Sequence, residues 1–442
     1  MYEDLTLDDL VIRSSSHTPF FGVYLAAHAV ADALCMCHAS VGCKVKTQQH
    51  LSAHDFGTEA HNRMRYSQFI DEDLIQGSTE QLESEIIAFA RRLGSQLVVI
   101  DSSTPVSLQA QPLGPVVERL RQKTGVDVLA IATRNYQDDL YAGYAATVAA
   151  IFRRQFERFE VHVQPDQVSV LGVPFDRFEG DCQGNVAEVR RLLAGIGLRA
   201  TSVYLAGEPY ARLSHTTQAR GHLVLPWAHG QLRELQKTPG LPAGSLHKVS
   251  LPMGFAGTQR WIKQVADALQ IPQARADAFV AAELQTAKPL AELARRVLRG
   301  QRFAAFAEAP RLVGLILLLS ELNMTPTVLG VTHFRLGGQR EVEAMLAEHG
   351  VTLPKDVQWL IDPTPQQVRG LAGEGSGTAL HGTSIAIGTT IERELLGDCG
   401  VPFLEFGFPS EQRHFLQPAP WLGFHGALRL AEQVMQTVTR RR

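Results

Sequence analysis

The sequence lacks the long apolar segment that a membrane-spanning or secreted chain carries. Its longest apolar run covers residues 315–319, whereas a transmembrane helix needs about 20 apolar residues. The chain opens on Met1, Tyr2, Glu3 and Asp4, and no apolar signal core follows this acidic start. We therefore expect a cytoplasmic chain with no membrane span.

Cysteine is also scarce. The 442 residues include only 5 cysteines, which is too few for a disulfide framework in a chain of this size. In the cytoplasm these thiols are expected to stay reduced, and the reduced thiol is the form that binds metal.

Several motifs that would identify an enzyme class are missing as well. The sequence contains no G-x-x-x-x-G-K-[ST] loop for ATP, no G-x-S-x-G hydrolase elbow, and no C-x-x-C or H-E-x-x-H pair for zinc. Strong charge of one sign is missing too, since the formal net charge is −3 and the pI is about 6.6. Without a basic stripe and interleaved aromatic residues, no nucleic-acid partner is expected.

What the sequence does contain is a regular alternation of short β-branched runs and amphipathic helical segments. Residues 33–37 and 96–100 are predicted to be buried strands, and a helix over residues 80–93 lies between them in the chain. Further along, helices are predicted over residues 185–194 and around 210–219. Strands that alternate with helices of this length form βαβ units and parallel sheets.

Three such series follow one another along the chain. The predicted fold class is therefore α/β, with three Rossmann-like domains whose parallel sheets are flanked by helices. We place the domains at residues 1–163, 164–300 and 301–442, the last of which ends in a C-terminal helix.

One cysteine stands out by its place in the chain. Residues 38–43, His-Ala-Ser-Val-Gly-Cys, directly follow the predicted strand at 33–37, so Gly42 and Cys43 lie at a strand's carboxyl end, where open α/β sheets bind ligands. A thiolate there is a suitable iron–sulfur ligand, but one cysteine cannot hold a cluster, so the other ligands would come from another chain. Alternatively, Cys43 is a small buried residue in a tight turn. Gly42 suits either hypothesis, because it lets backbone approach closely.

The other four cysteines carry weaker signals. Cys35 and Cys37 are two residues apart on the predicted strand, so their side chains share a face, which is either a metal face or part of the packed core. We favour core packing for this pair. Cys182 and Cys399 are expected in loops.

The segment after Cys43 is rich in basic and histidine side chains. They are Lys44, Lys46, His50, His54, Asp55, His61, Arg63 and Arg65. In one interpretation a lysine offsets cluster charge, while His54 and Asp55 supply protons or bind an anionic substrate, since histidine titrates near neutral pH. In the other, which we favour for any single residue, the segment is a solvated helix face with interface salt bridges.

Five stretches carry a resemblance to a known family. Residues 38–43 match a cluster loop H-G-x-x-G-C, residues 71–82 a segment x-G-G-x-x-x-L, residues 180–193 a second-domain opening, residues 321–326 a third-domain E-L-G-M-x-P, and residues 407–427 a C-terminal G-F-P…R-H…G-Y-x-G-A. Together they resemble the nitrogenase component-1 superfamily, which includes the molybdenum–iron protein, its cofactor-assembly scaffold and the dark-operative tetrapyrrole reductases. The C-terminal motif is typical of the β-type subunit.

The departures from the family pattern are informative. A full β-type nitrogenase subunit carries three cluster cysteines, and the matching positions here are Thr18, Cys43 and Thr104. One ligand from this chain and three from an α-type partner is the pattern of the tetrapyrrole reductases and the scaffold, and it implies a [4Fe–4S] cluster shared between subunits. Where the α-type subunit holds a metallocofactor, this chain has residues 226–228 (Pro-Trp-Ala) and 405–407 (Glu-Phe-Gly), so it is not expected to ligate one.

The resemblance implies a β-type subunit of a nitrogenase-like, ATP-dependent two-component reductase. A homologous α-type subunit would complete an α2β2 heterotetramer, and a separate P-loop iron–sulfur protein would hydrolyse ATP and deliver electrons for a small-molecule substrate. The alternative is a non-catalytic scaffold for nitrogenase-type cofactor assembly, which has the same ligand pattern. A third hypothesis is a metal-free Rossmann-like binding protein in which Cys43 is merely buried.

Overall fold

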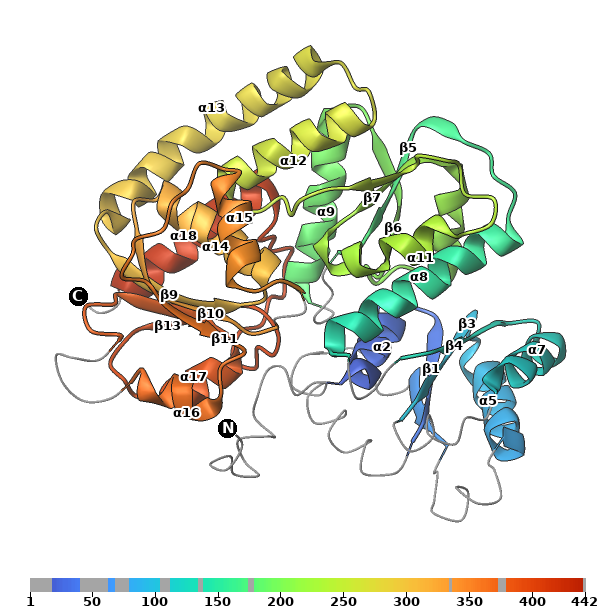
Figure 1. The fold of residues 1–442 in the computed structure, drawn as a ribbon. Helices are drawn as coiled ribbons and strands as arrows, with labels where there is room; N and C mark the ends of the chain where they lie inside the picture. The colour runs from blue at the N-terminus through green and yellow to red at the C-terminus, as the bar shows by residue number, and fades with distance from the viewer. Residues whose placement is uncertain are drawn as a thin grey trace. The chain divides into compact units, whose positions relative to one another are not determined.

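The computed structural model describes residues 18–39, 63–67, 79–103, 112–133, 138–173, 179–333, 336–372 and 379–439 (Figure 1). The strands are β1 (Ala33–His38), β2 (Met64–Tyr66), β3 (Leu97–Ser102), β4 (Asp127–Ile131), β5 (Gln164–Leu171), β6 (Arg199–Val203), β7 (Ala219–Val224), β8 (Leu246–Lys248), β9 (Arg302–Ala307), β10 (Thr325–Val331), β11 (Gln358–Ile361), β12 (Ile385–Gly388) and β13 (Phe403–Glu405).

The helices fill the intervals between these strands. They are α2 (Pro19–His28), α5 (Thr79–Leu93), α7 (Leu113–Thr124), α8 (Leu140–Arg158), α9 (Gly180–Gly195), α10 (Tyr210–Leu213), η3 (Ser214–Gln218), η4 (Pro226–Gln231), α11 (Leu232–Gln236), α12 (Gly254–Ala268), α13 (Gln273–Leu298), α14 (Ala309–Glu321), α15 (Gln339–Ala347), α16 (Pro365–Gly370), α17 (Thr390–Leu396) and α18 (Gly423–Thr439). None of these described helices combines the length and the apolar composition that crossing a bilayer requires.

The described strands form three sheets, and every strand pair in them is parallel. Their orders are β2-β1-β3-β4, β6-β5-β7-β8 and β11-β10-β9-β12-β13. In each order the earliest strand lies inside the sheet, as in doubly wound α/β folds, where the chain moves outward in both directions from a central strand. The predicted fold class is confirmed.

The chain divides into two compact units. One holds His17–Glu179 and Arg199–Lys248 and carries the first two sheets; the other holds Gly180–Leu198 and Val249–Arg442 and carries the third. The three-domain boundaries near residues 163 and 300 stay a prediction.

The first sheet has a different helical cover on each face. Leu34 and Met36 of β1 point to one face, where they form a core with α5 and α7. The opposite face of the sheet lies under α2 and α8, as Figure 1 shows. The third sheet is layered in the same way, with α16 and α17 packed over Phe306 and its neighbours on one face and α14 and α18 on the other.

Two local predictions are wrong. The helix expected around residues 210–219 is a single α-helical turn followed by the 3₁₀ turn η3, and β7 already begins at Ala219. The Ser214 Oγ donates to the Ala211 oxygen (2.7 Å) and the Thr217 Oγ1 to the Ser214 oxygen (3.1 Å), and such local side-chain bonds compete with a continuous helix.

The second error concerns Cys182, which lies buried inside α9 and not in a loop. This helix begins at Gly180, five positions before the predicted start at residue 185, because its first turn packs against the segment before α18. A Cβ at Gly180 would lie 2.0 Å from the backbone oxygen of Gln417, and one at Gly184 would lie 2.5 Å from the backbone nitrogen of Ala419. Glycine at both positions lets the two backbones touch, which outweighs its poor helix propensity. Cys399 lies outside the helices and strands, half-buried, as predicted.

Candidate metal centre

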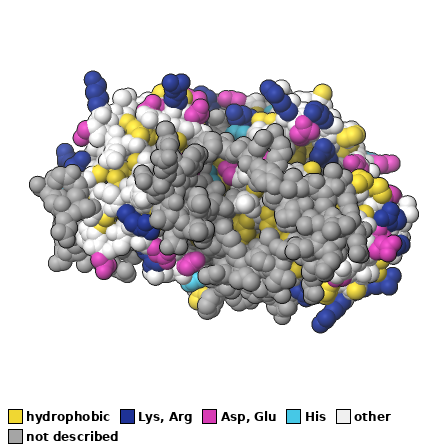
Figure 2. All heavy atoms as spheres, turned by 60° about the horizontal axis from the view of Figure 1, so that its bottom comes forward, with side chains coloured by type: hydrophobic (Ala, Val, Ile, Leu, Met, Phe, Trp, Pro, Cys, Tyr) yellow, Lys and Arg dark blue, Asp and Glu magenta, His cyan; other side chains and the backbone are white. Residues whose placement is uncertain are grey.

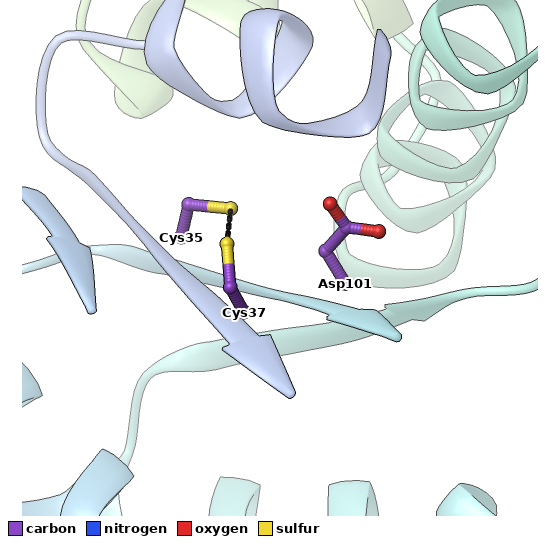
Figure 3. Close-up of side chains that lie close together, drawn as sticks. All are labelled: Cys35, Cys37 and Asp101. Carbon is purple, nitrogen blue, oxygen red and sulfur yellow. Dashed lines mark hydrogen bonds between the residues drawn. The ribbon is translucent and has the colours of Figure 1, made fainter. Parts of the chain in front are cut away.

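Three potential metal ligands converge inside the first sheet. The Sγ atoms of Cys35 and Cys37 are 3.9 Å apart, and these two atoms and one carboxylate oxygen of Asp101 all lie within 4.8 Å of one another (Figure 3). The three residues are 2%, 0% and 0% exposed, respectively. Two thiols and a carboxylate are therefore gathered at one buried point.

The strand geometry explains this convergence. Side chains alternate between the two faces of a strand, so Cys35 and Cys37 point to the same face of β1. In the parallel pairing of β1 with β3, Cys37 lies opposite Asp101, which brings the carboxylate beside the second thiol. Figure 3 shows all three side chains projecting from β1 and β3 toward the side on which α2 and α8 lie.

The two covering helices are in close backbone contact with each other. A Cβ on Gly22 of α2 would lie 1.8 Å from the backbone oxygen of Leu140, and one on Gly143 of α8 would lie 2.0 Å from the backbone oxygen of Pro19. Reciprocal glycines therefore allow the helices to pack tightly over the sheet. The layer that covers the three ligands has no room for a larger residue at these two positions.

The opposite face of β1 carries a different polar pair at the same end of the strand. His38 is 1% exposed, and its Nδ1 lies 2.7 Å from the Oγ of Ser67, which follows β2. The imidazole is thus oriented by a hydroxyl from the neighbouring strand. It lies next in sequence to the segment that leads to Cys43.

The amino end of the sheet holds a carboxylate of another kind. Asp127 at the start of β4 accepts hydrogen bonds from the Nε of Arg154 (2.7 Å), from Arg158 and from the Tyr210 hydroxyl (2.9 Å). Burial, and then the Asp127 charge, raise the pKa of Tyr210 above its usual range. Asp127 is therefore a structural acid held by two cations, whereas Asp101 stands beside two thiols.

A cavity of about 660 Å³ runs along the edge strand β4, between α7 and α8. Its polar lining includes His38 and Ser102 at the carboxyl ends of β1 and β3, with Arg121 from α7 and Arg153 from α8.

On the surface shown in Figure 2, the coloured Lys and Arg side chains are interspersed with Asp and Glu.

The residues singled out in the sequence have different outcomes. Gly42, Cys43, His54 and Asp55 lie outside the described residues, so their roles stay predictions. Cys35 and Cys37 do share a buried face, as predicted.

The sequence alone did not place Asp101 beside the two thiols. The sequence does show that a carboxylate follows four apolar residues, 97–100, which are all buried in a strand. That signal identifies a special position, but only the register between β1 and β3 shows that Cys37 lies opposite it.

Comparison with known proteins identifies the family. A profile of the nitrogenase component 1 type oxidoreductases matches residues 18–439, nearly the whole chain. The chain belongs to this family. The predicted resemblance is thereby confirmed.

Curated relatives come from two branches of the family. The chain is 24% identical over 190 residues to the nitrogenase molybdenum-iron protein beta chain of Clostridium pasteurianum (42% of this chain and 38% of that protein). It is 24% identical over 213 residues to a light-independent protochlorophyllide reductase chain of Synechococcus sp. (46% and 41%), and 23% identical over 283 residues to the molybdenum-iron protein beta chain of Azotobacter vinelandii (58% and 52%). These matches span between 38% and 52% of the relatives' own lengths.

Solved structures agree with the fold. Nitrogenase Cp1 at pH 6.5 matches with a TM-score of 0.76 at 18% identity, over 95% of this chain and 91% of that one. The same protein at pH 5 matches with a TM-score of 0.71 at 13% identity, over 96% and 88%. This chain therefore has the component 1 fold.

Proposed function

We propose that the chain is the β-type subunit of the catalytic component of a nitrogenase-like, ATP-dependent two-component reductase. In this proposal Cys43 contributes one ligand to a [4Fe–4S] cluster that an α-type partner completes with the other three. Family membership supports this role, as does the likeness to nitrogenase beta chains and to a protochlorophyllide reductase chain.

The burial of the other cysteines is the observation that carries the proposal. Cys35, Cys37 and Cys182 are buried, and the half-buried Cys399 packs beside the core of the third sheet. A ligand shared between subunits must reach the surface of its own chain. Of the four cysteines that the structure describes, three are buried and Cys399 is partly engaged by the third-sheet core, so we assign the shared ligand to Cys43.

The position of Thr18 is consistent with a single-ligand subunit. Thr18 lies directly before α2, where the family resemblance expects the first cluster cysteine, and its exposed side chain ends in a hydroxyl. Neutral hydroxyls are poor ligands for iron–sulfur clusters, which are held by thiolates. The partner would therefore supply the ligands that this chain lacks.

The two segments that correspond to the metallocofactor ligands of an α-type subunit are occupied by other interactions. Trp227 is buried in the first unit at 1% exposure. The Glu405 carboxylate accepts hydrogen bonds from Thr390 (3.1 Å), Ser410 (3.2 Å) and the backbone nitrogen of Gln412 (2.9 Å), and pairs with Arg393 (3.1 Å). Both segments therefore have structural roles, which supports a chain that holds no cofactor of its own there.

The remaining roles follow from this assignment. The cluster, when bound, supplies one-electron transfer to the substrate. Cys43 holds iron, Gly42 lets the loop backbone approach the cluster, and His54 and Asp55 bind an anionic group of a small-molecule substrate or hold a proton for it. ATP is hydrolysed by a separate P-loop iron–sulfur protein, and the complete catalytic component is an α2β2 heterotetramer.

The decisive test is the iron content and low-temperature EPR spectrum of the complex of this chain with its α-type partner, purified under strict anoxia. Wild type is expected to hold about four irons per αβ pair, as one cubane with four protein ligands requires. Cys43→Ala is expected to lose or alter the signal while the complex still assembles. The matched control is Cys399→Ala, which removes a half-buried thiol of the third-sheet core and should leave the iron unchanged.

The outcomes separate the candidate functions. Reduction of a substrate with electrons from a P-loop iron–sulfur protein and ATP establishes the reductase. A cluster that is transferred to apo-nitrogenase without turnover of a substrate establishes the scaffold. An iron-free complex, or a Cys43→Ala complex with unchanged iron, refutes both.

A further inference from the structure

We propose that Cys35, Cys37 and Asp101 bind one Zn²⁺ ion at a site separate from the cluster assigned to Cys43. Nothing in the proposed reductase role requires this ion. It would lie inside the chain, between the first sheet and α2 and α8, and not at a subunit surface.

The spacing of the thiols fits a zinc ion. Zinc binds cysteine sulfur at about 2.3 Å in a tetrahedral arrangement, which places two sulfur ligands about 3.8 Å apart. The observed Sγ–Sγ distance of 3.9 Å needs no change of the strand. A carboxylate oxygen ligand should lie about 3.5 Å from each sulfur. All three ligand atoms lie within 4.8 Å of one another here, so a side-chain rotation that moves the carboxylate oxygen by at most about 1.3 Å completes the triangle.

The kinds of donor atom favour zinc over magnesium and calcium. Magnesium and calcium take oxygen ligands and bind thiols poorly, whereas zinc takes sulfur and carboxylate oxygen together. Three protein ligands leave a fourth tetrahedral position for a water molecule. On binding, each thiol loses its proton to solvent, so one Zn²⁺ enters and two protons leave without any change of oxidation state.

The charges of the three donors suit a cation. A Zn²⁺ ion between the buried carboxylate of Asp101 and the two thiolates would have negatively charged donors from both strands, and Figure 3 shows the carboxylate beside the two sulfur atoms.

The ion would join two strands that lead toward the predicted cluster positions. Cys35 and Cys37 belong to β1, which ends at His38, five residues before Cys43 in sequence. Asp101 belongs to β3, which ends at Ser102, two residues before Thr104. A zinc ion that bridges β1 and β3 would therefore join the two strands near their carboxyl ends without contacting Cys43.

The test measures zinc in the full-length chain in complex with its partner, by elemental analysis after exhaustive desalting. Wild type is expected to hold about one zinc per chain. Cys35→Ala, Cys37→Ala and Asp101→Asn are each expected to reduce it at least tenfold. The matched control Cys182→Ala removes an equally buried thiol in the other unit and should keep the zinc.

Cys43→Ala separates this inference from the proposed function. It should lose iron and keep zinc, whereas Cys35→Ala should lose zinc and keep the iron signal. Zinc that follows Cys43, or zinc that survives in all three ligand variants, overturns the site. Loss of iron in Cys43→Ala would stand regardless of the zinc result.

A second measurement covers the case in which a ligand variant fails to fold. Wild-type chain is loaded with Co²⁺ in place of zinc, and its absorption spectrum and the released protons are recorded. Thiolate-to-cobalt charge transfer, with about two protons released per ion, supports the site. Wild type that takes up no stoichiometric Zn²⁺ or Co²⁺, or Co²⁺ bound without thiolate bands, refutes it.

Discussion

The first and third sheets share one architecture but carry opposite chemistry toward their carboxyl ends. In the first sheet, Cys35, Cys37 and Asp101 offer sulfur and oxygen donors at one point. In the third, Glu308 after β9 pairs with the buried Arg311 (3.3 Å), and Glu405 of β13 is held by Arg393. Each of these two acids of the third sheet is thus paired with an arginine of the same unit.

This difference shows that fold alone does not locate the chemistry. Both sheets wind outward from a central strand, and such sheets bind ligands where the strand order reverses. The residues at those strand ends decide the outcome, because a carboxylate whose oxygen atoms are engaged by an internal guanidinium is a poorer metal ligand. The described part of the third sheet is built as a structural support, and the first keeps metal-ligand donors.

The variant with the largest expected effect tests whether the ion pair between Glu308 and Arg311 stabilises the third sheet. Arg311 is 1% exposed, and its guanidinium also stacks on Phe406 and Trp421, 5.6 and 5.0 Å from the ring centroids. Arg311→Met leaves Glu308 buried without this cation. We expect the free energy of unfolding, measured by urea titration, to fall by about 4 kcal/mol.

Two further variants show whether the lost charge balance is the cause. Arg311→Met combined with Glu308→Gln should recover part of the loss, since the buried charge is removed with its partner. Arg296→Met on an exposed position of α13 should change the free energy by less than about 0.5 kcal/mol. An Arg311→Met variant as stable as Arg296→Met would remove the contrast between the two sheets.

The next two variants test how tightly α2 and α8 cover the face of the first sheet that carries Cys35 and Cys37. Gly22→Ala and Gly143→Ala place a methyl group within 2.0 Å of a backbone oxygen, so α2 and α8 must separate. Each should lower the free energy of unfolding by about 3 kcal/mol and speed the reaction of Cys35 and Cys37 with a thiol reagent.

Gly114→Ala is the matched control for the two helix-crossing variants. Gly114 lies in α7, and nothing lies within 4 Å of the Cβ that the substitution adds. It should be neutral or stabilise the protein by up to about 1 kcal/mol, because alanine restricts the unfolded chain. Equal stability for all three alanine variants would contradict the tight cover over the thiols.

The two sheets also differ in how well sequence predicts them. Strand β1 was predictable because five consecutive apolar residues, 33–37, stand before a glycine-containing loop. The shared face of Cys35 and Cys37 followed from strand alternation alone. The partnership of Cys37 with Asp101 did not, because it depends on which strand pairs with β1 and in which register.

Tertiary packing explains the predictions that were wrong. Cys182 lies in a helix because the glycines of α9 contact the backbone before α18, from residues more than 200 positions later in the chain. In the third sheet, β12 and β13 are only 4 and 3 residues long, so they carry little local signal. Strand pairing and helix contacts of this range are invisible in a local pattern.

The second sheet lies between the other two in its chemistry. Its buried titratable group contacts a hydroxyl and aromatic rings. His222 lies 2.6 Å from the Ser169 Oγ and packs edge-on against Phe152, with the ring centroids 5.0 Å apart. Burial, and then repulsion by His247, lower the pKa of His222 to about 3. Because the unfolded chain takes up this proton near pH 6.5, stability is lost as the pH falls below that value.

The matching measurement is the pH dependence of urea unfolding. Between pH 6.5 and 5, wild type should lose about 1.6 kcal/mol more than His222→Gln, since the cost rises from about 0.7 kcal/mol per pH unit at pH 6.5 toward about 1.4 kcal/mol per pH unit at pH 5. The exposed His162 is the control, and His162→Gln should follow wild type. Parallel curves for wild type and His222→Gln would show that His222 takes up its proton as readily in the folded chain as in the unfolded chain.

The smallest effect compares two copies of one motif within the third-sheet unit. Thr389 is the N-cap residue of α17 and Thr364 that of α16, and each forms a capping box with the residue three positions later. The Thr389 box is buried, with its Oγ1 donating to Glu392 at 2.6 Å, whereas the Thr364 box is exposed. We expect Thr389→Ala to cost about 1 kcal/mol and Thr364→Ala about half of that.

Burial is the physical reason for the difference between the two caps. Thr389→Ala removes a hydrogen bond from a carboxylate that is 2% exposed and that water cannot easily reach, so the lost bond is not replaced. At Thr364 the freed backbone N–H of Gln367, which the side chain accepts from at 3.2 Å, can bind solvent instead. Equal losses in urea titrations of both variants would mean that water reaches the buried cap at Thr389 as easily as the exposed cap at Thr364, and the contrast between the two sheets would then rest on the ion pairs of Arg311 and Arg393.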